Sequence, residues 1–316
     1  MNRRDLLQFA GAATAGIGLW ASDPEGVQGS NKRDAFPQPR NLAAPFIETS
    51  DGAMLFYKEW GTGKPMLFVH SWSVNTHLWQ YQMVDLSSRG FRCIAYDQRG
   101  HGRSNDPGRG FDYDTLADDL HHVIETLGLR DVVLVGHSMG CGEIVRYATR
   151  HGASRISRVV LVAPTLPFAL KTPDNPDGVS RENFERLRAA WKTDLPKWLE
   201  DNARPFFSPQ TSQSMLTWAV QMGQQASLKA LIECNIATTE TDFRAELPKF
   251  NIPTLIIHGD ADVSAPIDFT GRRTANLIPQ CQLKVYPGAP HGLMFTHAEQ
   301  LNADLLSFCN GNNPSA

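Results

Sequence analysis

Ser138 stands in the setting that best suits a nucleophile in the 316-residue sequence. It lies midway between Gly136 and Gly140, after the apolar run 132–135 and before residues 143–148, which carry a helical pattern. A serine at a tight turn between a strand and a helix forms a nucleophile elbow, which lifts its hydroxyl clear of the sheet. The flanking glycines remove side chains that would collide there. The free N–H groups at the start of the helix could stabilise an oxyanion.

A serine hydroxyl needs a base to take its proton, and ten histidines in the sequence compete for this task. His291 lies in a loop rich in proline and glycine after the last predicted strand. His137 belongs to the elbow itself and His258 ends a strand, whereas His121 and His122 fall on a predicted helix. No pair of histidines has ligand spacing with a third group nearby, so the sequence predicts no metal site.

The base in such a site needs a carboxylate that orients its imidazole ring and stabilises the ring when it is charged. Two aspartates, Asp260 and Asp262, lie in the loop that follows the predicted strand 253–258. Both positions place a carboxylate just beyond the end of that strand. The residues alone therefore leave the choice between the two aspartates open.

Strands and helices alternate along most of the chain. The spacing of apolar residues predicts helices over residues 79–86, 114–127, 143–148 and 296–308. Such an alternation requires a mostly parallel sheet with helices on both faces. The apolar runs predict strands at residues 46–49, 54–58, 66–69, 91–96, 132–135, 159–163, 253–258 and 282–286.

Five short motifs follow one another between the predicted strands and helices. They are His70-Ser71-Trp72, Asp97-Gln98-Arg99-Gly100-His101-Gly102-Arg103-Ser104, Gly136-His137-Ser138-Met139-Gly140, His258-Gly259-Asp260-Ala261-Asp262 and Gly288-Ala289-Pro290-His291-Gly292. In this order they resemble the α/β-hydrolase family over about residues 45–309. Within that family they look most like the branch of aryl esterases, perhydrolases and non-haem haloperoxidases. The resemblance implies an α/β protein with the α/β-hydrolase fold, in which a mostly parallel central sheet has helices on both faces and carries a helical cap.

The resemblance also implies how the chain is divided. Residues 41–164 and 248–316 would form the two parts of the α/β-hydrolase core, and residues 165–247 the helical cap between them. Bulky apolar side chains of the cap are expected to line a substrate pocket. The candidates for contact with substrate are Phe168, Trp191 and Trp218, and the other bulky apolar residues of the cap are Trp198, Phe206, Phe207, Met215 and Met222.

The catalytic residues that the resemblance implies form a triad in the chain order serine, acid, histidine. Ser138 would be the nucleophile and His291 the base. The Gly-Asp-x-Asp pattern of the family places the catalytic carboxylate at its second aspartate, which is Asp262 here. Asp260 is then expected to brace the turn instead.

The resemblance places the oxyanion hole at two backbone N–H groups, those of Met139 and Trp72. The sequence departs from the family at two neighbouring positions. Ser71 stands where the family usually has glycine, and Ser73 stands where haloperoxidase-like members commonly have proline. Because proline fixes φ near −65°, its absence predicts a loop like that of a plain esterase. We therefore expect hydrolysis to dominate over perhydrolysis.

The first 40 residues are predicted to be an export signal and linker outside the fold. Arg3 and Arg4 precede a mildly apolar stretch that ends at Trp20 and is too short to span a bilayer comfortably. This arrangement resembles a twin-arginine export signal. It predicts a periplasmic or secreted protein that uses the twin-arginine machinery, and a cytoplasmic protein with a disordered or amphipathic leader is the alternative.

Composition excludes several other classes of protein. The formal net charge of −3 and the lack of a basic cluster argue against a nucleic-acid partner and against a stable membrane anchor. The five cysteines have no Cys-x-x-Cys spacing, so they predict neither a disulfide framework nor a metal site. Cys141, beside the elbow, is interpreted as a small buried residue.

Together these features predict a serine hydrolase that cleaves a small, fairly apolar ester or lactone through an acyl-enzyme, without a cofactor. Serine at position 138, in place of aspartate, argues against haloalkane dehalogenase and epoxide hydrolase chemistry. The nearest alternative is a perhydrolase or non-haem chloroperoxidase that uses the same triad with hydrogen peroxide. Carbon–carbon hydrolysis, lyase activity and a non-catalytic ligand-binding protein also stay open, as do the physiological substrate and the oligomeric state.

Overall fold

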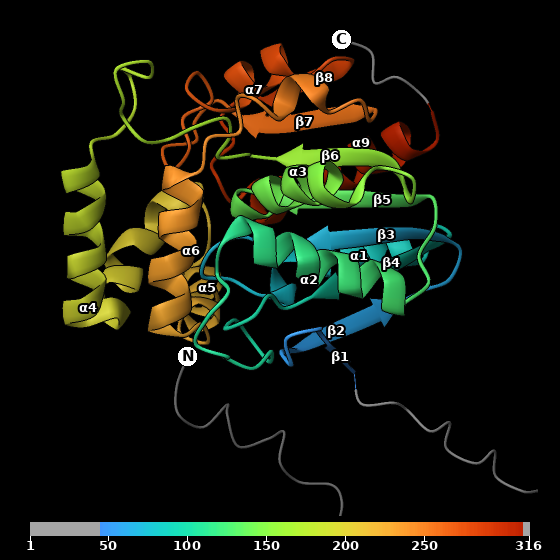
Figure 1. Ribbon diagram of the computed structural model, residues 1–316, viewed down its shortest axis with the longest axis horizontal. Coiled ribbons are helices and arrows are strands. Elements are labelled where there is room, and N and C mark those ends of the chain that lie inside the picture. Colours follow the sequence, from blue (N-terminus) through green and yellow to red (C-terminus); the bar gives the residue numbers. More distant parts are fainter. Residues whose placement is uncertain (1–44, 312–316) are drawn as a thin grey trace, which may run out of the picture. The chain divides into compact units, whose positions relative to one another are not determined.

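An eight-stranded sheet runs through the centre of the molecule (Figure 1). The computed structural model describes residues 45–311, so the predicted export signal and linker at residues 1–40 lie outside the described residues. The strand order is β1-β2-β4-β3-β5-β6-β7-β8, and all neighbours from β4 to β8 are parallel. The strands are β1 (Phe46–Glu48), β2 (Met54–Trp60), β3 (Lys64–Val69), β4 (Phe91–Tyr96), β5 (Val132–His137), β6 (Ile156–Val162), β7 (Thr254–Gly259) and β8 (Cys281–Tyr286).

Only the first two strands depart from the parallel arrangement in the described sheet. β1 and β2 form a hairpin, and β2 pairs antiparallel with β4. Residues 49–53 close the hairpin. The N–H of Ala53 donates to the Thr49 hydroxyl at 3.0 Å, and the N–H of Thr49 donates to the carbonyl of Ala53 at 2.8 Å. The predicted α/β class with a mostly parallel central sheet is confirmed.

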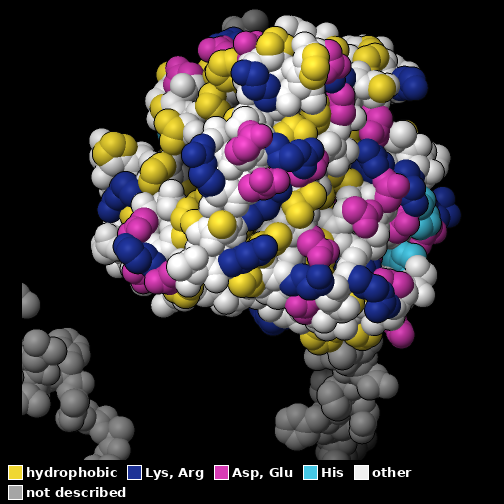
Figure 2. All heavy atoms as spheres, turned by 60° about the vertical axis from the view of Figure 1, so that its left-hand side comes forward, with side chains coloured by type: hydrophobic (Ala, Val, Ile, Leu, Met, Phe, Trp, Pro, Cys, Tyr) yellow, Lys and Arg dark blue, Asp and Glu magenta, His cyan; other side chains and the backbone are white. Residues whose placement is uncertain are grey.

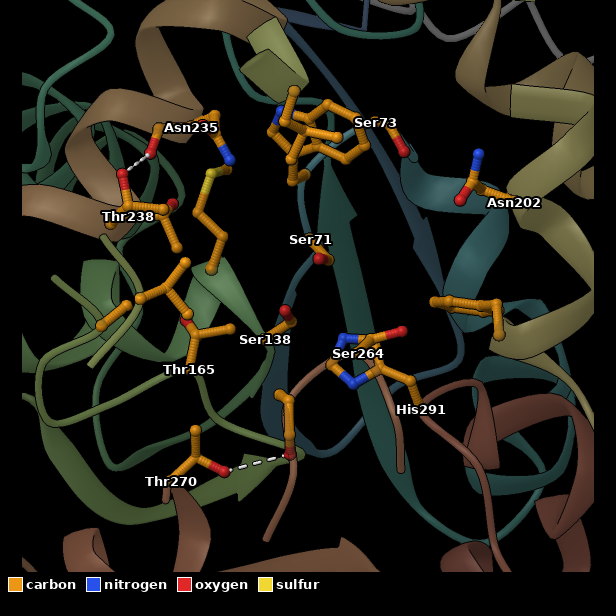
Figure 3. A pocket seen from close by; sticks show the side chains of 18 of the residues that line it. Ser71, Ser73, Ser138, Thr165, Asn202, Asn235, Thr238, Ser264, Thr270 and His291 are labelled. Atoms are coloured by element: carbon orange, nitrogen blue, oxygen red, sulfur yellow. Dashed lines mark hydrogen bonds between the residues drawn. The ribbon is translucent and has the colours of Figure 1, made fainter. Parts of the chain in front are cut away.

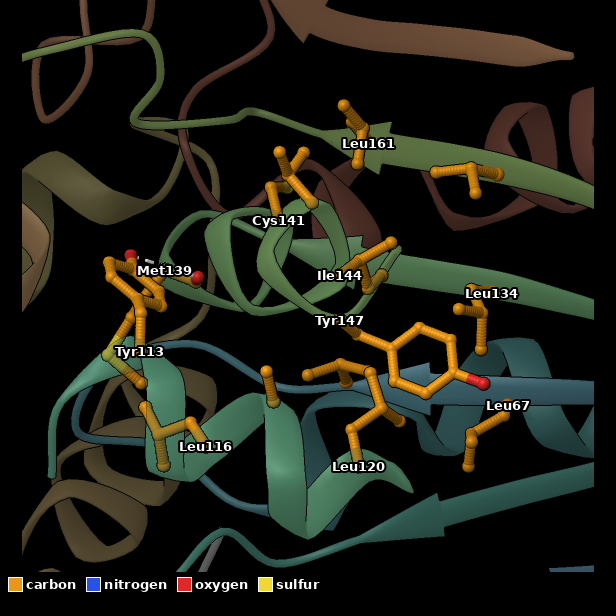
Figure 4. Packing of buried hydrophobic residues seen from close by; sticks show 14 of the residues in the cluster. Leu67, Tyr113, Leu116, Leu120, Leu134, Met139, Cys141, Ile144, Tyr147 and Leu161 are labelled. Carbon is orange, nitrogen blue, oxygen red and sulfur yellow. Dashed lines mark hydrogen bonds between the residues drawn. The ribbon is translucent and has the colours of Figure 1, made fainter. Parts of the chain in front are cut away.

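Helices cover both faces of the sheet, and the alternation of strand residues decides which side chains they meet. On one face, Leu67 and Leu134 pack against α2 and α3, as Figure 4 shows. On the other face, Phe68 and Val133 pack with residues of α1 and α9. The helices on the sheet are α1 (Gln80–Ser87), α2 (Tyr113–Thr126), α3 (Met139–His151), α7 (Gly271–Leu277), α8 (Leu293–Thr296) and α9 (Ala298–Cys309), and the 3₁₀ turn η1 (Thr76–Trp79) precedes α1.

The segment between β6 and β7 is largely helical and lies beyond the carboxyl ends of the parallel strands (Figure 1). It includes residues 165–247, which were predicted to form the cap. Its longest helix is broken at Asp194, whose φ of −157° is not helical, and Pro196 follows. The elements are α4 (Arg181–Ala203), η2 (Arg204–Phe206), α5 (Gln213–Gly223) and α6 (Leu228–Glu240), and η3 (Leu247–Lys249) leads back to the sheet.

The turn at residues 97–104 carries structural contacts. The Asp97 carboxylate accepts the N–H of Thr76 at 2.7 Å and the N–H of Arg103 at 2.8 Å, which ties the loop after β4 to the loop after β3. The buried Arg99 guanidinium donates to Asp119 on α2 and to Asp51 in the first hairpin. These bonds hold the loop after β4 against α2 and the first hairpin.

Charged side chains of both signs are interspersed on the face that Figure 2 shows. Several are paired across helices; for example, Arg150 on α3 lies 3.0 Å from Asp118 on α2. Such exposed pairs contribute little stability each, about 0–1 kcal/mol. In residues 45–311 no helix is both long enough and apolar enough to cross a bilayer.

Candidate active site

Ser138 occupies the turn between β5 and α3, in a backbone conformation that non-glycine residues rarely adopt. Its φ is +53° and its ψ is −114°, a strain of about 1–3 kcal/mol by the usual cost of such outliers. The nucleophile elbow packs closely against the loop after β3. A Cβ on Gly140 would lie 2.6 Å from the carbonyl oxygen of His70 in that loop. The N–H of Ser138 is held by the carbonyl of Val162 at 2.9 Å. A hydrogen bond to the end of β6 therefore holds the strained turn in place.

Asp262, rather than Asp260, lies against His291. The Nδ1 of His291 is 2.6 Å from Oδ2 of Asp262. The other carboxylate oxygen, Oδ1, accepts the N–H groups of Ser264 and Ala265 at 2.9 and 2.8 Å. Burial alone would raise the pKa of Asp262, but His291 and these hydrogen bonds hold it well below its usual range, so the carboxylate stays ionised.

Asp260 faces the other way. Its Oδ1 accepts the N–H of Gly288 at 2.6 Å, and its own N–H donates to the carbonyl of Tyr286. It thus links the loop after β7 to the loop after β8, the loop that carries His291. This is the bracing contact expected of Asp260.

Ser138 and His291 meet in one cavity although they come from loops after β5 and β8. Figure 3 shows both side chains directed into it. Because Asp262 engages Nδ1 of His291, the nitrogen available to the Ser138 hydroxyl is Nε2. The described chain thus brings the three predicted residues Ser138, Asp262 and His291 together.

None of the other histidines weighed as a base lines this cavity. His137 is fully buried, and its Nε2 lies 3.1 Å from the carbonyl oxygen of His291. Burial and the neighbouring His291 lower the pKa of His137 far below its usual value, so its ring is neutral and donates to that carbonyl. His121 and His122 lie on α2.

The predicted oxyanion hole consists of the backbone N–H groups of Met139 and Trp72. Met139 is the first residue of α3, and Trp72 follows the end of β3 by three residues. Within residues 45–311 no acceptor binds the backbone N–H of either residue. The Trp72 indole is engaged separately, since its Nε1 donates to the carbonyl of Leu231 on α6 at 2.7 Å. Both residues line the cavity.

Ser73, next to Trp72, has a φ of +62°. Proline cannot adopt this value, so the loop takes a path that is closed to a chain with proline at this position. The proline-free loop was expected from the residue type, but its left-handed conformation was not, because only glycine signals such a φ in a sequence.

The cavity has a volume of about 590 Å³, and its wall is mostly apolar with several aromatic rings. Phe168 and Trp191, both predicted to contact substrate, line it. Trp218 does not, and this expectation is corrected: its ring packs 5.8 Å from that of Phe295 and 6.1 Å from that of His77. On α5 the adjacent Ala219 and Val220 face the cavity instead. The further aromatic residues that line the cavity are Phe184, Trp198, Phe206, Phe207 and Phe269.

Polar side chains also line the cavity. They include Thr165, in the loop after β6, and Asn235 and Thr238 on α6 (Figure 3). None of these three residues lies in a sequence motif, so none was predicted to line a pocket. Among residues 45–311 no group of three or more His, Cys, Asp or Glu side chains is placed to hold a metal ion.

Comparison with known proteins agrees with this geometry. The sequence profile described as alpha/beta hydrolase fold matches residues 64–298. The non-heme chloroperoxidase CPO-A1 of Kitasatospora aureofaciens is 42% identical over 275 residues, which cover 84% of this chain and 99% of that protein. The bifunctional esterase/perhydrolase DCH of Acinetobacter calcoaceticus is 37% identical over 272 residues, 83% of this chain and 98% of that protein.

A solved structure shows the same architecture. The esterase EaEST of Exiguobacterium antarcticum superimposes with a TM-score of 0.82 at 31% identity, over 84% of this chain and 99% of that one. Haloperoxidases, esterases and perhydrolases are thus all among the relatives of this chain. The chain belongs to the α/β-hydrolase family.

Proposed function

We propose that this protein is a serine hydrolase that cleaves carboxylic esters or lactones through an acyl-enzyme. The observation that carries the proposal is the 2.6 Å contact between His291 and Asp262 in the wall of the cavity that Ser138 also lines. A base held by a buried carboxylate beside a serine on a strained turn is the arrangement that acyl transfer requires.

The reaction follows from the positions of these groups. His291 Nε2 takes the proton of the Ser138 hydroxyl as Oγ attacks the carbonyl carbon of the ester. The N–H groups of Met139 and Trp72 stabilise the oxyanion, and removing one such donor typically costs about 10²–10³ in rate. His291 returns the proton to the leaving alcohol, which leaves the acyl group on Ser138. Water then attacks this ester with His291 again as the base, and the carboxylic acid departs.

The cavity supports an apolar substrate. Aromatic side chains from the cap, among them Phe168, Trp191 and Trp198, surround the space above Ser138. Burying apolar groups there would contribute about 25 cal/mol per Å² of surface removed from water. A volume of about 590 Å³ suits an ester or lactone with a ring or a chain of several carbons.

Perhydrolysis is the second candidate, and the relatives favour it. One relative is named a non-heme chloroperoxidase and another a bifunctional esterase/perhydrolase. In that reaction hydrogen peroxide replaces water at the acyl-enzyme and a peracid departs instead of the acid. The left-handed Ser73 supports hydrolysis as the main activity, because the loop takes a backbone path that proline at this position cannot adopt.

The proposal includes an export signal within residues 1–40. The arginine pair and the mild apolar stretch support export by the twin-arginine machinery to the periplasm or beyond. That route exports proteins already folded, so a chain that needs no disulfides could mature by it. The cysteines of residues 45–311 are all free thiols.

The test is a panel of nitrophenyl esters and lactones with acyl groups of increasing size, assayed with the wild type and with Ser138→Ala. We expect the wild type to hydrolyse apolar esters and Ser138→Ala to lose several orders of magnitude of kcat. Peracid formation at millimolar hydrogen peroxide should be slight beside hydrolysis of the same ester. Peracid formed as fast as acid would assign the protein to the perhydrolases instead, and a panel with no Ser138-dependent turnover would leave a ligand-binding role.

A further inference from the structure

A second histidine touches the carboxylate of Asp262. His258, at the carboxyl end of β7, is fully buried, and its Nε2 lies 3.1 Å from Oδ2 of Asp262. The same nitrogen lies 2.9 Å from the carbonyl oxygen of Ala265. Unlike His291, His258 does not line the cavity, so it has no access to substrate.

The neighbours of His258 determine where its proton resides. Nε2 faces two oxygen atoms that can only accept, so Nε2 must carry the hydrogen and donate it. Nδ1 has no hydrogen-bond partner within residues 45–311 and is packed against the start of α7. A Cβ on Gly271 would lie 2.4 Å from Nδ1, so glycine is needed for this close packing. The ring is thus held in one orientation and one tautomer.

The Asp262 carboxylate has every oxygen engaged as a result. Oδ1 accepts two backbone N–H groups of the following turn, and Oδ2 accepts one hydrogen from His291 and one from His258. The two backbone hydrogen bonds hold only Oδ1, so on their own they would let the carboxylate group rotate about that atom. The bond from His258 removes that freedom at the oxygen that serves His291.

We propose that His258 is a positioning residue that fixes Oδ2 of Asp262 and limits how strongly this oxygen stabilises a charged His291. The inference rests on the proposed function, because it assigns His258 a task in the same serine-hydrolase site. A carboxylate oxygen that already accepts one hydrogen bond offers less negative charge to a second donor. His258 thereby weakens the stabilisation that Asp262 gives to a charged His291.

The ionisable groups around His258 are few. Asp262 contacts it directly, and His137 and His291 are the other histidines near that carboxylate. The arginines of α7 are engaged elsewhere, since Arg272 pairs with Asp268 and Arg273 pairs with Asp177. The acid limb of the pH–rate profile is therefore expected to respond to His258 through Asp262.

Three substitutions separate positioning from packing. His258→Leu removes the donor and keeps an apolar side chain, whereas His258→Gln can place an amide N–H near the position of Nε2. His258→Asn has an amide too short to reach Asp262. The control is His101→Leu, which removes another fully buried histidine whose hydrogen bond goes to the carbonyl of Arg99.

The measurement is kcat/KM for a nitrophenyl ester between pH 5 and pH 9, with thermal unfolding of each variant. For His258→Leu we expect a loss of about 10- to 100-fold, the range for a hydrogen bond to a charged group, and an acid limb moved to higher pH. The Gln variant should retain most of the wild-type kcat/KM and the wild-type acid limb, whereas the Asn variant should retain neither. The control should keep the wild-type limb.

Two results would overturn the inference. One is a His258→Leu enzyme with the wild-type rate and pH profile. The other is equal impairment of the Gln and Asn variants with an unmoved acid limb, which would assign His258 to packing alone; this comparison stands even if the Leu variant does not fold. Failure of the proposed function is recognised separately, because Ser138→Ala would then retain the ester hydrolysis.

Discussion

Two aspartates two residues apart have different tasks in this molecule. Asp262 is buried and contacts His291, whereas Asp260 is exposed and accepts the N–H of Gly288. The family motif favours Asp262 over Asp260, and in the folded loop Asp262 is the carboxylate that contacts His291. The difference can be measured by the same substitution at each position.

Asp262→Asn should lower kcat about 10⁴-fold, because an amide would favour the wrong tautomer of His291. Asp260→Asn should cost less than about tenfold, since an amide oxygen can still accept a hydrogen bond from Gly288. Steady-state kinetics on one ester, with folding checked by circular dichroism, compares the two variants. A larger loss for Asp260→Asn would reassign the acid.

Among the elements, the loop after β3 has a backbone conformation that its sequence does not predict. Ser73 holds a φ of +62° beside the Trp72 N–H that is assigned to the oxyanion hole. Proline at this position would force φ to about −65° and rebuild the loop. Glycine would adopt the observed conformation without the strain of about 1 kcal/mol that a side chain incurs there.

We therefore expect Ser73→Gly to keep the esterase rate and to be as stable as the wild type or more stable. Ser73→Pro should lower both the melting temperature and kcat, because the oxyanion donor moves with the loop. Thermal unfolding and ester kinetics on the two variants test this. A Ser73→Pro enzyme with unchanged stability and rate would show that the loop does not hold the left-handed conformation.

The sequence predicts elements better than it predicts how their side chains are directed. The parallel strands β3 to β8 were recognisable because buried parallel strands are continuous apolar runs. Trp218 was misplaced because successive residues of a helix point about 100° apart, and only packing decides which one faces a cavity. The contact of His137 with His291 joins loops that are distant in the chain, and the contact of His258 with Asp262 depends on how a single loop folds, so no sequence pattern predicts either contact.

At the scale of the whole molecule, a buried acid couples stability to pH. Glu143, on α3 beneath the elbow, is fully buried and accepts hydrogen bonds from the Tyr96 hydroxyl and the Gln98 amide. Burial raises the pKa of Glu143 to about 8, against 4.5 for an ordinary glutamate. The folded state thus holds this proton more tightly than the unfolded chain does.

The direction in which stability changes with pH follows from this difference in pKa. The contribution of Glu143 is fully present below about pH 4.5 and declines as pH rises toward about 8. Glu143→Gln cannot ionise, so its free energy of unfolding should fall less between pH 5 and pH 9 than that of the wild type. Urea unfolding of both proteins at the two pH values measures this. Parallel declines would show that Glu143 does not titrate in this range.

Export concerns the whole chain as well. Changing Arg3 and Arg4 to lysine keeps the charge but removes the arginine pair of a twin-arginine signal. We expect this variant to stay in the cytoplasm at full length, folded and active on esters. Fractionation of cells followed by ester assays of each fraction gives the answer. Unimpaired export of the variant would remove the support for this route.

The central claim is that Ser138 is the nucleophile, and a fluorophosphonate tests it most directly. The Ser138 oxygen would bond to phosphorus as fluoride leaves and His291 takes the hydroxyl proton. The measurement is peptide mass spectrometry of the labelled protein, with residual ester hydrolysis followed in parallel. The account predicts one phosphonyl group per chain, on Ser138, with activity lost in proportion to labelling. A fully labelled protein that keeps its activity, or an inactivated protein labelled at another residue, would contradict it.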